Sequence, residues 1–151
     1  MLTPTVRLQS RDVSEFDPAH SLINDLLLIE DPQERLGAVL DRARRRPALG
    51  NTDRNERNRV QGCQSQVWIK GTSTTKSIQF AGDSDSPLVR GLVVLLCDYF
   101  SGEIADSRAR LESGIDPLES LGLSQNLSST RRLGLQAVRI RLKQLASATP
   151  N

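Results

Sequence analysis

Aromatic residues are scarce in this chain of 151 residues. Only Phe16, Trp68, Phe80, Tyr99 and Phe100 carry an aromatic ring, too few for the row of stacking rings on which proteins hold single-stranded nucleic acid. Hydrophobic residues still make up 37% of the sequence, which is enough for one core built mainly from aliphatic side chains. The length is that of a single domain, so we expect one domain rich in aliphatic helices.

The chain also has little excess charge, two cysteines and one histidine. The 20 basic residues exceed the 18 acidic ones by only two, so the overall charge does not favour binding to nucleic acid. Two cysteines, Cys63 and Cys97, and a single distant His20 supply neither a disulfide framework nor a four-ligand zinc site. This composition is typical of a reducing compartment, and we expect a cytoplasmic protein.

The hydrophobic runs are short. The longest unbroken one is Leu92–Cys97, whereas a membrane-spanning helix needs about 20 apolar residues. Residues 1–16 lack the apolar block of a secretory signal. We therefore expect neither export nor a membrane partner, and we divide the chain into an N-terminal tail (1–16), one domain (17–147) and a C-terminal tail (148–151).

Four helix starts are predicted by a capping residue followed by proline. These pairs are Asp17-Pro18, Asp31-Pro32, Ser86-Pro87 and Asp116-Pro117. The helix after Pro87 is apolar on nearly every side as far as Phe100, so we expect it in the middle of the fold. Ser128 or Ser129 is expected to cap a last helix.

Between these helices the sequence changes to a β-type pattern. Val67–Ile69 and Ile78–Phe80 are short β-type runs, and residues 71–76 are typical of a hairpin connection. We expect Val60 to begin an earlier, third strand that turns at Gly62. The order of elements predicts an α+β fold, with a small three-stranded antiparallel sheet packed on helices.

Cys63 and Cys97 stand in opposite surroundings. Cys97 lies in the apolar helix, where a free cysteine behaves as a small core hydrophobe. Cys63 follows Gly62 and precedes Gln64 and Ser65, directly before a strand, which favours a position at a loop tip. These residues alone leave open both an inert and a reactive cysteine.

Three blocks of sequence resemble a known family. The segment Val60–Ile69 (VQGCQSQVWI) closely resembles the cysteine-bearing loop of the SufE/CsdE family, sulfur acceptors that work with cysteine desulfurases. Residues 82–92 (GDSDSPLVRGL) and 123–135 (LSQNLSSTRRLGL) agree in order and spacing. With the helical opening from about Phe16, the resemblance covers nearly the whole chain except its tails. Since this fold is similar to that of IscU-type iron–sulfur scaffolds, the resemblance implies a SufE/IscU-like α+β fold.

The resemblance implies that Cys63 accepts sulfur from the persulfide of a cysteine desulfurase. Cys63 would carry it as its own persulfide to an iron–sulfur scaffold or another acceptor, and would thereby stimulate the partner. The transfer needs a thiolate that reaches into the partner's active site. Gly62 would permit close approach, and Arg131, which matches the family's arginine, is the candidate stabiliser of a charged sulfur. Pyridoxal phosphate is expected on the partner, and no cofactor on this chain.

Four further residues have two interpretations each. Asp83 and Asp85 match the family's acidic pair, and they either orient the cysteine loop and regulate its exposure or cap the next helix and bind strand-end amides. Gln64 and Ser65 either satisfy loop amides or contact the partner. We also expect the free protein to shield Cys63 in an apolar pocket until docking extends the loop.

Two other functions remain open. A thiol redox sensor would form a sulfenic acid or mixed disulfide on Cys63. A non-catalytic interaction domain would bind an acidic partner through Arg42, Arg44, Arg45 and Arg46, although such a cluster equally complements the negative end of a helix dipole. Because only Cys63 is placed for sulfur chemistry, we expect neither cluster assembly nor zinc binding on this chain.

Overall fold

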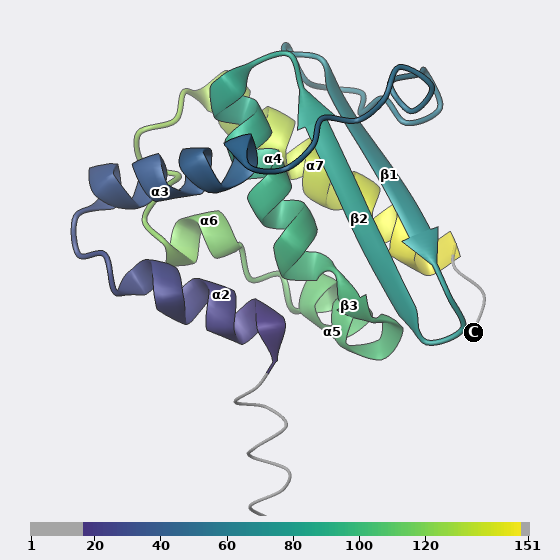
Figure 1. The fold of residues 1–151 in the computed structure, drawn as a ribbon, viewed down its shortest axis with the longest axis horizontal. Helices are drawn as coiled ribbons and strands as arrows, with labels where there is room; N and C mark the ends of the chain where they lie inside the picture. Colours follow the sequence, from purple (N-terminus) through teal and green to yellow (C-terminus); the bar gives the residue numbers. More distant parts are fainter. Residues whose placement is uncertain (1–16, 149–151) are drawn as a thin grey trace, which may run out of the picture.

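The computed structural model describes residues 17–148 (Figure 1). The tail expected at 1–16 and residues 149–151 of the other expected tail lie outside this range. Six helices and three strands follow one another within it. In chain order they are α2 (Pro18–Leu27), α3 (Pro32–Arg44), β1 (Val67–Ser73), β2 (Ser77–Ser84), α4 (Pro87–Phe100), β3 (Gly102–Glu103), α5 (Ile104–Ser113), α6 (Pro117–Ser120) and α7 (Ser129–Ala148). The predicted α+β fold is confirmed.

The predicted helix starts are confirmed by their capping hydrogen bonds. The side chains of Asp17, Asp31 and Asp116 each accept a hydrogen bond from the amide two residues further on. Ser86 Oγ caps α4 by accepting from the amide three residues further on, and Ser128 Oγ accepts from the Arg131 amide in the first turn of α7. Each cap satisfies an amide that has no partner inside the helix.

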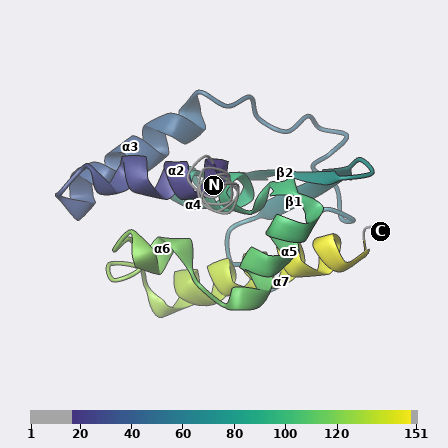
Figure 2. The same ribbon diagram turned by 90° about the horizontal axis from the view of Figure 1, so that it is seen from below.

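Helix α4 lies at the centre of the fold, as its apolar sequence predicted. It packs against β2 on one side and against α3, α2, α7, α6 and α5 on the others, an arrangement visible in Figures 1 and 2. Leu92, Val93 and Phe100 have no exposed surface. Gly82 of β2 permits close contact, because a Cβ there would lie 2.5 Å from Val93 Cγ1 and 2.9 Å from Cys97 Sγ.

The sheet has the order β1-β2-β3, and both pairs are antiparallel. Alternate residues of β2, Ile78 and Phe80, are buried in the core. The third strand is β3 and not the expected segment at Val60, where Arg59 forms a single bridge with Trp68. That segment pairs only briefly with β1 because the chain turns at Gly62, whose φ is +92°.

Two features of the helices complete the fold. Helix α5 was not predicted, and it packs against α7 and β3. Helix α7, the last and longest, also packs against β1 and α4. Within residues 17–148, no helix is both long enough and apolar enough to cross a membrane.

Candidate functional site

Cys63 lies in the turn before β1 and packs on α7. Its side chain is half-buried, and its Sγ atom donates a hydrogen bond to the carbonyl oxygen of Gly134 at 3.3 Å. The sulfur therefore faces a helix and does not project into solvent as a loop tip would. Gly134 leaves room for this contact, because a Cβ there would lie 3.4 Å from the sulfur, at the limit of ordinary van der Waals contact.

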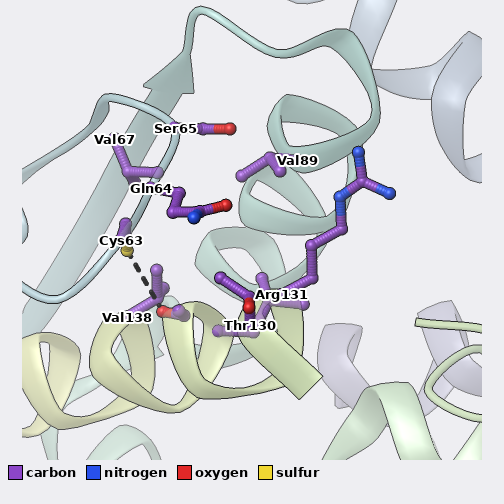
Figure 3. A pocket seen from close by; sticks show the side chains of 10 residues that line it. Cys63, Gln64, Ser65, Val67, Val89, Thr130, Arg131 and Val138 are labelled. Atoms are coloured by element: carbon purple, nitrogen blue, oxygen red, sulfur yellow. Dashed lines mark hydrogen bonds between the residues drawn. The ribbon is translucent and has the colours of Figure 1, made fainter. Parts of the chain in front are cut away.

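A cavity of about 80 Å³ opens beside the sulfur (Figure 3). It is bounded by the cysteine loop, the start of β1, α4 and α7, which supply both apolar and polar walls. The lining residues are Cys63, Gln64, Ser65, Val67, Val89, Thr130, Arg131, Gly134, Leu135 and Val138. The structure thus brings Gln64, Ser65 and Arg131 to the same cavity as Cys63, and their roles there stay predictions.

The resting thiol of Cys63 is held in its neutral form. Burial raises the pKa of this thiol above its ordinary value. The hydrogen bond to Gly134 needs the S–H proton, so it too favours the thiol over the thiolate. Because the thiolate is the nucleophile, burial and this hydrogen bond both lower the share of the reactive form in the free protein.

Arg131 lies at the cavity, and its guanidinium extends away from Cys63 (Figure 3). It stands with Arg132 in the first turn of α7, where its amide donates to Ser128 Oγ at 3.2 Å. Cations at a helix N-terminus are disfavoured by the helix dipole, but Arg132 binds the carbonyl oxygens of Ser124 and Gln125 in the preceding segment. Arg131 and the positive end of the helix dipole place positive charge beside the cavity. Stabilisation of a charged sulfur by Arg131 stays a prediction.

Asp85 holds the other end of the cysteine loop. Its Oδ1 accepts a hydrogen bond from the Gln66 amide at 3.0 Å, and its own amide donates to the Gln66 carbonyl at 3.2 Å. The cap of α4 is Ser86 and not this aspartate. Asp85 therefore binds a strand-end amide, at the residue that directly precedes β1, and a role in placing the cysteine loop stays a prediction.

Asp83 is the centre of a buried ionic network. Its carboxylate has no exposed surface and accepts hydrogen bonds from Arg54 at 2.6 Å, Arg90 at 2.9 Å and the amides of Leu49 and Ser84. Burial opposes ionisation of this carboxyl, but the hydrogen bonds from Arg54, Leu49 and Ser84 and the charge of Arg54 outweigh it and lower its pKa. Arg90 also bonds two carbonyls at the end of α3. Asp83 thus fixes the fold beside the site and does not line the cavity.

Gly62 completes the loop at its start. Its φ of +92° lies in the region that favours glycine, and a Cβ there would lie 3.5 Å from Ala137 Cβ. The loop therefore rests on α7 at two successive turns, at Gly134 and at Ala137. Gly134 was missed from the sequence, although an isolated glycine inside a helical pattern is the available signal for such a contact.

Cys97 belongs to a different environment. It is 1% exposed and contacts Gly82 of β2, and burial raises the pKa of its thiol strongly, which confirms it as a core residue. Within residues 17–148, no group of three or more His, Cys, Asp and Glu side chains is placed to hold a metal ion. Cys63 is accordingly the cysteine on which sulfur chemistry would depend.

Three of the four arginines in the basic cluster at the end of α3 pair with two carboxylates. Arg42 and Arg46 both pair with Asp98 of α4, the latter at 2.7 Å, and Arg44 pairs with Asp41. The pairs with Asp98 link α3 to α4. Together the three pairs reduce the charge that the cluster offers to an acidic partner.

Comparisons with known proteins agree with this fold and show the family. The solution structure of a hypothetical protein from Thermus thermophilus is similar, with a TM-score of 0.65 over 86% of this chain and 93% of that one, at 17% identity. The model of the SufE family, the Fe–S metabolism associated domain, matches residues 20–146. SufE-like proteins of Rhizobium etli and Rhizobium meliloti are 33% identical over 129 residues, covering 83% of this chain and 86% and 91% of theirs. This chain belongs to the SufE family, which confirms the resemblance seen in its sequence.

Proposed function

We propose that this chain accepts a sulfane sulfur from a cysteine desulfurase and carries it as a persulfide on Cys63 for Fe–S metabolism. The observation that supports the proposal is a cavity beside Cys63, in a member of a family associated with Fe–S metabolism. The pyridoxal phosphate that releases sulfur from cysteine would belong to the desulfurase, and an iron–sulfur scaffold or another acceptor would receive the sulfur.

The transfer is a thiol–disulfide type of exchange. Cys63 first gives up its proton to solvent or to a base of the partner. Its thiolate then attacks the outer sulfur of the partner's cysteine persulfide, and a new S–S bond forms at Cys63. The old S–S bond breaks with its electron pair on the partner's inner sulfur, which leaves as a thiolate. One sulfur atom moves, and the pair of proteins undergoes no net oxidation.

The cavity suits the product of this step. A water molecule needs about 10–15 Å³ of such space, so about 80 Å³ beside Sγ has room for one more sulfur atom. Val67, Val89 and Val138 give it apolar walls that would keep cellular thiols from the persulfide. A carried sulfur would thereby survive until the next acceptor binds.

Activation requires the loop to move. In the free protein the sulfur is half-buried and bonded to Gly134, so docking would draw Cys63 away from α7 and break this bond. The bonds between Asp85 and Gln66 would anchor the end of the loop while its centre extends. Arg131 would then lie free to turn towards the charged sulfur.

The proposal is tested by mass spectrometry after incubation with a cysteine desulfurase and L-cysteine. One extra sulfur that a reductant removes should appear on the Cys63 peptide, and desulfurase turnover should rise. Cys63→Ser should lose both effects, whereas Cys97→Ser controls for loss of the other thiol and should retain them. No added sulfur, under conditions that load an established acceptor, would contradict the proposal.

The same variants separate the two alternatives. A redox sensor would show a sulfenic acid or mixed disulfide on Cys63 after peroxide and no sulfur from the desulfurase. An interaction domain would bind its partner equally well with Cys63→Ser. Neither outcome is expected, because Cys97 is buried against β2 and three arginines of the α3 cluster are paired within the chain.

A further inference from the structure

Helix α7 carries an apolar strip whose two large side chains, Leu133 and Ile140, lie outside the core. Leu133 is 63% exposed and Ile140 is 59% exposed, in a molecule whose other large apolar side chains are mostly buried. Leu133, Ala137 and Ile140 follow the spacing i, i+4, i+7, which places them on one face of the helix. We call these three residues the α7 strip.

The α7 strip runs beside the cysteine loop. A Cβ at Gly62 would touch Ala137 of the strip, and Cys63 rests on Gly134, the residue next to Leu133. The strip is thus separate from the cavity lining but adjacent to the loop that holds the sulfur. A protein that reaches Cys63 from this side would cover the strip in the same contact.

The charges carried by helix α7 itself are all positive. Helix α7 has five basic residues and no acidic one among its 20 residues. Arg139 and Lys143 face carboxylates of neighbouring segments at 4.0 and 3.5 Å. Arg132 and Arg141 donate to backbone carbonyl oxygens instead, which leaves their positive charge in place, and Arg131 is exposed at the cavity mouth.

We propose that the α7 strip, with the arginines beside it, is the surface on which the desulfurase docks. This inference rests on the proposed function and adds the chemistry of the partner's surface, namely an apolar patch rimmed by Asp and Glu. Such a surface would bury Leu133 and Ile140 and complement the positive charge. A second copy of this chain fits less well, because a symmetric contact would bring the same cations together.

The test is a titration of the desulfurase with the Leu133→Gln, Ile140→Gln double variant. Glutamine keeps the helix propensity close to that of leucine, so the fold should persist. We expect the concentration for half-maximal stimulation to rise by about tenfold or more, as for loss of central contact residues, while the maximal stimulation stays the same. Loading of Cys63 by inorganic polysulfide should be unchanged, because the strip does not line the cavity.

The matched control is the double variant Leu28→Gln, Ile115→Gln. Both side chains are also exposed, at 81% and 56%, but neither lies on α7, so the titration should match the wild type. Added salt should weaken wild-type docking if the arginines take part. Identical titrations of the two double variants, or docking that does not depend on salt, would overturn the proposed surface. The sulfur-acceptor function would still stand if the wild type loads sulfur on Cys63. Failure of the wild type to load would overturn both.

Discussion

Asp85 and Gln66 are joined by two hydrogen bonds, in which each residue's backbone amide donates to the other residue. Oδ1 of Asp85 accepts from the Gln66 amide at 3.0 Å, and the Asp85 amide donates to the Gln66 carbonyl at 3.2 Å. They tie the end of the Cys63 loop to the turn between β2 and α4. Only the first bond uses a side chain, so a substitution can remove it without changing the backbone.

Asp85→Ala should make Cys63 more accessible in the free protein. One hydrogen bond is worth about 1 kcal/mol, and its loss corresponds to about a fivefold larger population of the open loop. Alkylation of Cys63 by iodoacetamide should accelerate by a similar factor. Asp85→Asn keeps a side-chain oxygen as acceptor and should react at nearly the wild-type rate. If the alanine variant reacts no faster than the wild type, Asp85 does not hold the loop.

Gly134→Ala should displace the sulfur without unfolding the protein. The new methyl would lie 3.4 Å from Sγ and 3.7 Å from Cα of Cys63, a tight contact that we expect the loop to relieve by moving outward by a few tenths of an ångström. Alanine favours a helix over glycine by about 1 kcal/mol, which offsets part of the cost. We expect faster alkylation of Cys63 with a small change in urea unfolding.

Gly37→Ala is the matched control for that substitution. Gly37 lies in α3, and a Cβ there would have no neighbour within 4 Å. It should raise the free energy of unfolding by about 1 kcal/mol and leave the alkylation of Cys63 unchanged. Equal alkylation rates for the two alanine variants would argue against the contact between Cys63 and Gly134 as the shield of the sulfur.

The sequence predicted those elements whose signals are local. The pairs Asp17-Pro18 and Asp31-Pro32 mark helix starts because a cap and a proline act within one turn. Helix α5 has no such signal: Glu103 makes no side-chain capping hydrogen bond, and only three of its residues are buried. Strand β3 has two residues and exists because α4 returns the chain beside Ile78, a long-range effect that local patterns do not contain.

The candidate site was predicted in part for the same reason. The loop around Cys63 could be recognised from adjacent residues, and the cavity places Gln64 and Arg131 beside it. The contact with Gly134 joins positions 71 apart in sequence, and periodicity does not show which turn of α7 meets the loop. The partners of Asp83 were missed similarly, since Arg54 lies 29 residues away from it.

The pH dependence of alkylation should reveal the protected state of Cys63. Burial raises the pKa of this thiol, so at a given pH less of it is the reactive thiolate than in an unfolded chain. The rate curve of the native protein should therefore lie at higher pH than that of the protein in denaturant. Peptide mapping should show Cys97 unmodified until the protein unfolds, because it is 1% exposed. A curve displaced to lower pH would mean that Arg131 or the start of α7 already stabilises the thiolate in the free protein.

Asp83→Asn should destabilise the fold in a manner that depends on pH. The variant leaves Arg54 and Arg90 without their buried carboxylate, a loss that costs about 3–5 kcal/mol at neutral pH. Since the folded state lowers the pKa of Asp83, its ionised form stabilises the protein above the ordinary aspartate pKa of about 4. This stabilisation is lost as the pH falls through the lower pKa of the folded state.

The free energy of unfolding, measured with urea, should therefore differ most between wild type and Asp83→Asn at pH 7. This difference should shrink below about pH 4. Asp41→Asn is the matched control, because its pair with Arg44 is exposed on both sides and should contribute less than about 1 kcal/mol at any pH. A difference for Asp83→Asn that stays constant down to about pH 3 would contradict the lowered pKa. Since Asp83 does not line the cavity, native Cys63 should be alkylated at the same rate in Asp83→Asn and Asp41→Asn. This result would distinguish Asp83, which supports the fold, from Asp85, which we expect to hold the loop.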